Sequence, residues 1–202
     1  MRRRTVFLAS IVFLLTLAAT AQEGRSEISL QGTGSFSKDS TGEGTSHSAT
    51  EAGGFLAAYR YRLNRWLSAE AAYGMNRDAQ KYFISSGAFR IQSNIHQATG
   101  GLVFNLPSLA KSKFSPYVLA EGGALVFNPT GNPFDTVAGA DTQAKGVFVY
   151  GGGVNYALRR HISLRAEYRG LVYGTPDFGF SAFHTGSITH TAQPSVGLAF
   201  RF

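Results

Sequence analysis

Residues 192–202 read AQPSVGLAFRF, and the alternation in this stretch decides the fold. Every second side chain is apolar, and the residues between them are small or polar. The apolar set comprises Ala192, Pro194, Val196, Leu198, Phe200 and Phe202, and the other set comprises Gln193, Ser195, Gly197, Ala199 and Arg201. Because successive side chains of a β-strand point to opposite faces, the stretch predicts a strand with one continuous apolar face.

The stretch 162–173, ISLRAEYRGLVY, alternates in the same way and places charges on one face. Arg165, Glu167 and Arg169 share that face, whereas Leu164 and Tyr168 lie on the other. A water-soluble sheet would turn the charged face to solvent, so this strand alone does not decide between a soluble and a membrane-embedded sheet.

Eight such segments can be placed along the chain. They cover residues 27–37, 53–63, 67–77, 94–106, 116–127, 146–158, 162–173 and 192–202. Each is close to the roughly 9–11 residues that a tilted membrane strand requires. The connections after the second, fourth and sixth segments are short, and the longer ones cover residues 38–52, 78–93, 128–145 and 174–191.

Two of the short connections predict a strand register. If Asn64, Arg65 and Trp66 form a three-residue turn, the flanking apolar residues oppose one another and Arg60 lies across from Glu70. A three-residue turn at 159–161 likewise pairs residue 155 with 165 and residue 153 with 167. A slip of one residue would turn every side chain to the other face, so the agreement of the two hairpins supports this register.

The N-terminus has the features of a secretory signal peptide. Three arginines follow Met1, residues 6–19 are apolar, and Ala19-Thr20-Ala21 is a small-x-small cleavage site. The apolar run is shorter than the roughly 20 residues of a spanning helix. We expect a signal peptide at residues 1–21 and a barrel domain at 22–202, with a formal charge that falls from +7 to +4 because the three arginines leave.

Composition excludes several classes of site. The chain has no cysteine, and therefore neither a disulfide nor a thiolate metal site. Beyond the signal it has no run of lysine and arginine, so nucleic acid is not an expected partner.

The alternating last strand ending on Phe202, behind a signal peptide, resembles outer-membrane β-barrels of the OmpA/OmpX type. The segments FSPYVLAEGGA (114–124), YGGGVNY (150–156) and SLRAEY (163–168) are similar to hairpins of that superfamily. The resemblance implies an all-β fold, a closed eight-stranded antiparallel up-and-down transmembrane β-barrel with periplasmic termini and short periplasmic turns. It also implies an assembly signal, read by the outer-membrane assembly machinery, at Val196, Leu198, Phe200 and Phe202.

In this register eight charged residues fall on the face turned away from lipid. They are Arg60, Arg62, Glu70, Glu121, Arg165, Glu167, Arg169 and Arg201. An arginine facing lipid at mid-depth costs about 2–4 kcal/mol, so the lumen is their expected place. Eight strands leave an interior just wide enough for side chains to fill, and we expect arginine–glutamate pairs to plug it. The alternative is a narrow channel for small or apolar solutes, resembling the OmpW type of porin.

The long connections are the candidate interaction surface, because binding residues concentrate on loops carried by a rigid scaffold. They are rich in aromatic residues, namely Tyr82, Phe83, Phe89, Phe134, Phe178, Phe180 and Phe183. One interpretation is a rim that engages lipopolysaccharide, a surface partner or an apolar ligand. The other is that these rings extend an aromatic girdle or pack on one another.

Two further candidate sites involve histidines. His161-Ile162-Ser163 resembles the His-x-Ser pair of lipid A deacylases, but His161 falls in a periplasmic turn, and the position near Thr175 that is expected to hold the partner carboxylate does not hold one. His47, His184 and His190 fall in long connections that share one rim, so a surface metal site is conceivable.

The sequence therefore predicts a small, monomeric outer-membrane protein with a structural or surface-interaction role and no enzymatic activity, metal or cofactor. Its expected partners are outer-membrane lipid, lipopolysaccharide and the assembly machinery. A soluble lipocalin-like barrel would need apolar residues inside and polar residues outside, which is the reverse of the expected arrangement.

Overall fold

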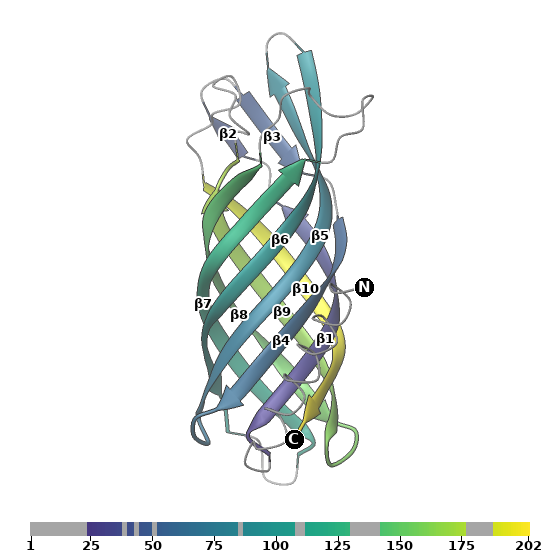
Figure 1. The fold of residues 1–202 in the computed structure, drawn as a ribbon, viewed down its shortest axis with the longest axis vertical. Helices are drawn as coiled ribbons and strands as arrows, with labels where there is room; N and C mark the ends of the chain where they lie inside the picture. Colours follow the sequence, from purple (N-terminus) through teal and green to yellow (C-terminus); the bar gives the residue numbers. More distant parts are fainter. Residues whose placement is uncertain are drawn as a thin grey trace, which may run out of the picture.

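The alternating segments form one closed antiparallel barrel in a computed structural model of the chain (Figure 1). The structure describes residues 24–37, 40–42, 45–49, 52–84, 87–107, 112–129, 142–176 and 188–202, so the expected signal peptide lies outside the described residues. The barrel strands are β1 (Ser26–Ser37), β4 (Ala52–Arg62), β5 (Leu67–Ile84), β6 (Gly87–Asn105), β7 (Phe114–Pro129), β8 (Gln143–Ala157), β9 (Ile162–Gly174) and β10 (Ile188–Arg201). The predicted closed, eight-stranded, up-and-down barrel is confirmed.

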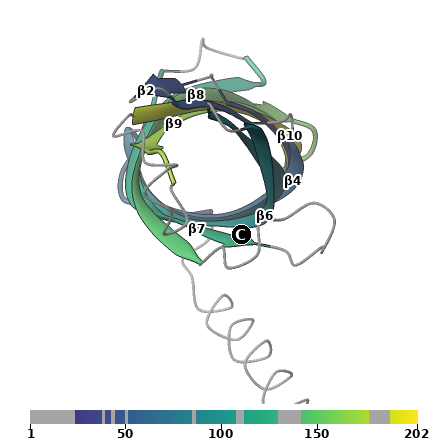
Figure 2. The same ribbon diagram turned by 90° about the horizontal axis from the view of Figure 1, so that it is seen from above.

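The end-on view in Figure 2 shows a closed ring. The first and last barrel strands pair to close it. β1 pairs with β10 in a register that sets Glu27 opposite Arg201. Two backbone hydrogen bonds complete this seam, from the Ser26 N–H to the Phe202 carbonyl (3.2 Å) and from the Phe202 N–H to the Ser26 carbonyl (2.9 Å). Both ends of the barrel chain therefore lie at the end that also carries the short turns.

The two predicted hairpin registers are confirmed. Arg60 pairs with Glu70 between β4 and β5, and Asn155 pairs with Arg165 between β8 and β9. The Asn64 side chain explains the first turn, because its Oδ1 accepts from the backbone N–H groups of Trp66 (2.8 Å) and Leu67 (2.9 Å). Such asparagine turns satisfy backbone donors that a tight reversal leaves without partners.

The prediction of a loop at residues 78–93 was wrong. β5 and β6 remain paired as far as Ile84 and Gly87, so this connection is a long hairpin. The expected loop at 38–52 contains two short strands, β2 (Ser40–Gly42) and β3 (Thr45–Ala49), and β3 pairs with the end of β5. β10 also begins at Ile188, so that His190 belongs to a strand and not to a loop.

The outer wall of the barrel is apolar. Its most exposed large side chains include Leu30, Leu102, Phe148, Val196 and Leu198, each about half exposed. Tyr59, Tyr73, Tyr150 and Tyr168 are also exposed, and the Tyr156 ring lies 4.9 Å from the ring of the exposed Phe114. A contiguous apolar surface of this extent is typical of a membrane-facing protein. Across the described ranges, no helix has the length and hydrophobicity needed to span a membrane.

Candidate functional site

Arg169 lies at the centre of a charged layer that crosses the lumen. Its guanidinium donates to Glu167 Oε1 (2.6 Å), Glu121 Oε2 (2.8 Å) and Glu70 Oε1 (2.6 Å). The other oxygen of Glu70 accepts from Arg60 Nε at 2.6 Å. The residues of these pairs lie on β4, β5, β7 and β9, so the contacts join opposite parts of the barrel wall.

A second arginine continues the layer toward the end with the termini. Arg165 forms an ion pair with Glu27 and donates to Asn155 Oδ1 (2.9 Å) and Ser29 Oγ (3.1 Å). Arg201 Nη2 donates to the other oxygen of Glu27 at 2.9 Å. Because Glu27 lies on β1 and Arg165 on β9, this pair reaches across the strand β10 that separates them.

Two neutral side chains complete the charged layer. The Tyr117 hydroxyl donates to Glu167 Oε2 at 2.5 Å, and the Arg60 guanidinium lies 4.2 Å from the centre of the Tyr117 ring. Thr99 Oγ1 donates to Glu121 Oε2 at 2.7 Å. Hydrogen bonds of this kind stabilise carboxylates that have lost their hydration.

The predicted charged residues thus come together with one exception. Arg60, Glu70, Glu121, Arg165, Glu167, Arg169 and Arg201 all form ion pairs. Within the described part of the chain, Arg62 has no carboxylate oxygen within 4.0 Å and lies at the mouth of the lumen instead. Sequence reasoning missed Glu27 and Tyr117, although both occupy lumen-facing positions in the predicted alternation.

A neutral polar layer borders the charged one. Gln31, Gln97 and Gln193 are each about 1% exposed. Gln193 Nε2 donates to Gln97 Oε1 at 3.3 Å, and Ser195 Oγ donates to Gln31 Oε1 at 3.0 Å. The Gln193–Gln97 bond crosses the lumen from β10 to β6, whereas the Ser195–Gln31 bond joins the neighbouring strands β10 and β1.

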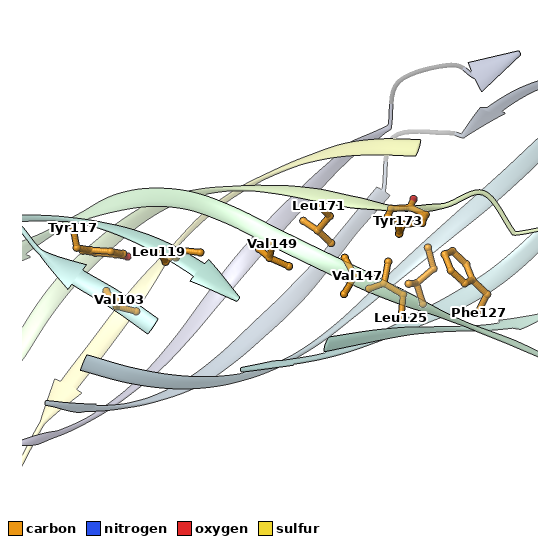
Figure 3. Close-up of a cluster of buried hydrophobic side chains, with 10 residues drawn as sticks. Val103, Tyr117, Leu119, Leu125, Phe127, Val147, Val149, Leu171 and Tyr173 are labelled. Atoms are coloured by element: carbon orange, nitrogen blue, oxygen red, sulfur yellow. The ribbon is translucent and has the colours of Figure 1, made fainter. Parts of the chain in front are cut away.

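The lumen is apolar along one wall toward the other end of the barrel (Figure 3). The buried side chains there are Ile95, Leu125, Phe127, Val147, Val149, Leu171 and Tyr173, from β6 to β9. The charges predicted for the inner face therefore fill only part of it. Sequence reasoning missed this wall, although the continuous apolar run at residues 124–127 is consistent with a strand that is apolar on both faces.

A model of the family described as outer membrane protein beta-barrel domain matches residues 6–202 of the chain. The chain belongs to this family. Comparison with curated proteins gives no match.

Solved structures of other outer-membrane barrels share the fold. Neisserial surface protein A is similar with a TM-score of 0.62 at 15% identity, over 88% of this chain and 97% of its own. OprG from Pseudomonas aeruginosa is similar with a TM-score of 0.59 at 13% identity, over 90% of this chain and 97% of its own. Ail, the attachment invasion locus protein of Yersinia pestis, was solved in complex with the heparin analogue sucrose octasulfate. It is similar with a TM-score of 0.50 at 18% identity, over 90% of this chain and 100% of its own. At these identities the likeness shows the fold alone.

The described residues of the two alternative sites each contact other groups in this outer-membrane barrel. His161 Nδ1 lies 3.0 Å from the Arg201 carbonyl oxygen, and Ser163 Oγ donates to the Ala199 carbonyl at 3.5 Å. His190 lies on the outer wall with its Nε2 at 2.8 Å from the Tyr150 hydroxyl. Over the described ranges, no three histidine or acidic side chains are grouped to hold a metal. His184 and the side chain of His47 lie outside the described residues.

The aromatic residues of the predicted interaction surface are described only in part. Tyr82, Phe83 and Phe89 belong to the backbone of the long β5–β6 hairpin, where Tyr82 pairs with Phe89. Their side chains, together with Phe134, Phe178, Phe180 and Phe183, lie outside the described residues.

Proposed function

We propose that this protein is a non-conducting outer-membrane barrel that carries a protruding β-sheet for interactions at the cell surface. The charged layer is the observation that carries the proposal. Glu70, Glu121, Glu167 and Arg169 have fully buried side chains, and the Arg60 side chain is only 6% exposed. Side chains anchored in this way fill the interior of an eight-stranded barrel.

The space between the charged layer and the end with the termini supports a closed lumen. Arg60, Glu27 and Arg62 border a cavity of about 10 Å³, which is close to the space that a single water molecule needs. A solute would have to break several buried ion pairs to pass this level. Each such break leaves an uncompensated charge, and that costs about 3–5 kcal/mol.

The opposite end of the barrel supports the surface role. β4 pairs with β5 only as far as Gly54 and Asn76, whereas β5 and β6 continue beyond it, and β3 pairs with β5 in the extension (Figure 1). β7 pairs with β6 from Ser93 onward, so among the described strands residues 87–92 have only β5 beside them. A strand edge without a neighbouring strand can pair with an added strand of a partner.

The apolar wall favours a second candidate function. Phe127, Val149 and Leu171 line the lumen beyond the charged layer and could accept an apolar solute. A narrow channel for such solutes would require the charged layer to open, because Arg169 is fully buried among three carboxylates.

Planar-bilayer conductance of the refolded protein tests the two candidates. We expect no reproducible openings, because the ion pairs close the lumen. Reproducible openings that vanish when Glu70 and Arg60 are altered would contradict the closed barrel and support the channel. An empty bilayer and a bilayer containing a known porin provide the negative and positive controls.

The last strand and the N-terminal segment carry the expected roles in assembly and targeting. Val196, Leu198 and Phe200 lie on the outer wall, and the Phe200 and Phe202 rings stack at 6.0 Å, which suits contact with lipid. We propose that these residues are read by the assembly machinery, that residues 1–21 are cleaved, and that lipopolysaccharide surrounds the outer end of a monomer.

A further inference from the structure

The end of the barrel that carries both termini holds a pocket lined by cations. Its volume is about 330 Å³. It is lined by Arg62, Arg65, Arg201, Trp66, Asn105 and Asn155, together with residues 106–107 and 115–116. Short turns lie at the periplasmic end of outer-membrane barrels, so the pocket opens toward the periplasm. Pockets of roughly 300–1,000 Å³ are typical of small-ligand sites.

The positive charge of this pocket is only partly balanced, because Arg201 pairs with Glu27 whereas Arg62 and Arg65 have no described carboxylate partner. Among the described residues no carboxylate lines it, and neither Arg62 nor Arg65 forms an ion pair with a described carboxylate. Glu27 and Arg62 both line the adjoining cavity of about 10 Å³, which forms a neck between the pocket and the lumen. Glu27 is already bound by Arg165 and Arg201. The Arg65 guanidinium lies 5.3 Å from the Trp66 ring centre, a contact that orients the group without neutralising it.

The donors match the geometry of an oxyanion. A guanidinium presents N–H groups in a planar fork that binds phosphate or carboxylate with two hydrogen bonds. Asn155 accepts from Arg165 through its oxygen, which leaves its amide N–H donors for a ligand. The neck of about 10 Å³ stops such a ligand at the mouth of the lumen.

We propose that this pocket, formed by Arg62, Arg65 and Arg201 around Trp66, is a periplasmic binding site for a phosphate group. The phosphate could belong to a soluble phosphomonoester or to an anionic phospholipid headgroup. Trp66 suits either source, because its ring stacks on Phe104 (centroids 6.3 Å apart, 14° between planes) on the outer wall. Both rings are partly exposed, so the pocket lies next to the lipid-facing surface.

Trp66 also supplies the measurement, because it is the one tryptophan of the chain. The probe is sn-glycerol 3-phosphate, titrated at constant ionic strength against the refolded full chain in phosphatidylcholine nanodiscs. A parallel arm replaces part of the phosphatidylcholine with phosphatidylglycerol. We expect a saturable change of Trp66 emission in at least one arm. A response to glycerol phosphate identifies a soluble ligand, and a response to phosphatidylglycerol alone identifies the headgroup.

Arg62→Gln removes one unpaired guanidinium and should weaken binding about tenfold or more, the value of a lost charge-assisted hydrogen bond. Arg62→Lys keeps the charge but loses the planar fork, so its affinity should fall between that of the wild type and that of Arg62→Gln. The matched control is Arg159→Gln with Arg160→Gln, which removes two exposed cations from the β8–β9 turn at the same end, outside the pocket. Each variant is first checked for folding by its heat-modifiable mobility.

Two results would overturn the site. One is the lack of a saturable emission change in both arms. The other is an equal loss of affinity in Arg62→Gln and in the turn control, because that would show diffuse attraction to a basic barrel end and no defined pocket.

Discussion

At the residue scale, Arg169 and Glu70 tie the lumen together. Arg169 donates to carboxylates on β5, β7 and on its own strand β9, and Glu70 accepts from Arg169 on one oxygen and from Arg60 on the other. These two hydrogen-bonded partners of Glu70 differ in what else they bind, and Arg165 approaches Glu70 to 3.8 Å. Arg169 retains Glu121 and Glu167 without Glu70, whereas Arg60 retains only a 3.7 Å approach to Glu167.

Glu70→Gln should therefore destabilise the barrel by about 3–5 kcal/mol, because it leaves Arg60 buried without a close carboxylate. The measurement is the urea midpoint of the refolded protein. Adding Arg60→Met should restore part of the loss, since the stranded charge is then removed. The restoration should be incomplete because Arg169 still lacks one of its three partners.

Arg160→Gln is the matched control, since it removes an exposed arginine from a turn and should change stability by no more than about 0.5 kcal/mol. Strict additivity of the Glu70 and Arg60 changes would show that the two residues do not interact. Unchanged midpoints in both single variants would contradict a stabilising charged layer.

At the element scale, the hairpins could be predicted because two constraints act together. A three-residue turn fixes which residues oppose each other, and the period-two alternation between lipid and lumen fixes the face, as at Arg60 and Glu70. Residues 78–92 escape this reasoning. They extend past the last pairing of β4 with β5, where the alternation between lipid and lumen no longer applies, although β5 and β6 stay paired there.

Contacts across the lumen could not be derived from neighbouring strands. Glu27 meets Arg165, although β10 lies between their strands, and Tyr117 on β7 meets Glu167 on β9. These pairs depend on the tilt and stagger of the closed sheet, which no single hairpin specifies. The apolar wall was missed for another reason: residues 124–127 are apolar on both faces, so their alternation does not tell the lumen from lipid.

The seam between β1 and β10 requires close approach at Gly197. A Cβ atom added there would overlap the Leu30 carbonyl oxygen and lie 2.5 Å from the Gln31 Cα. Gly197→Ala should therefore force the closing strands apart and lower the yield of folded, heat-modifiable protein. Gly122→Ala is the matched control, because nothing lies within 4 Å of its added Cβ. Equal yields of the two variants would contradict this reason for a glycine at the seam.

At the scale of the whole molecule, the lumen changes character along its axis. A cationic mouth around Arg62 is followed by the charged layer around Arg169, the glutamine layer, and the apolar wall that includes Phe127. A chain without cysteine has no disulfide to stabilise it. The closed sheet and these lumen contacts, with lipid outside, hold the fold instead.

Solute entry into liposomes tests most directly whether the charged layer closes the lumen. Refolded wild-type protein should give no swelling with arabinose beyond that of empty liposomes. The variant Arg60→Ser, Glu70→Ser, Glu121→Ser and Arg169→Ser removes two charges of each sign, keeps the net charge, and should admit arabinose once heat-modifiable mobility shows that it is folded. Swelling of the wild type at the rate of this variant, or a folded variant that stays impermeable, would contradict closure by these ion pairs.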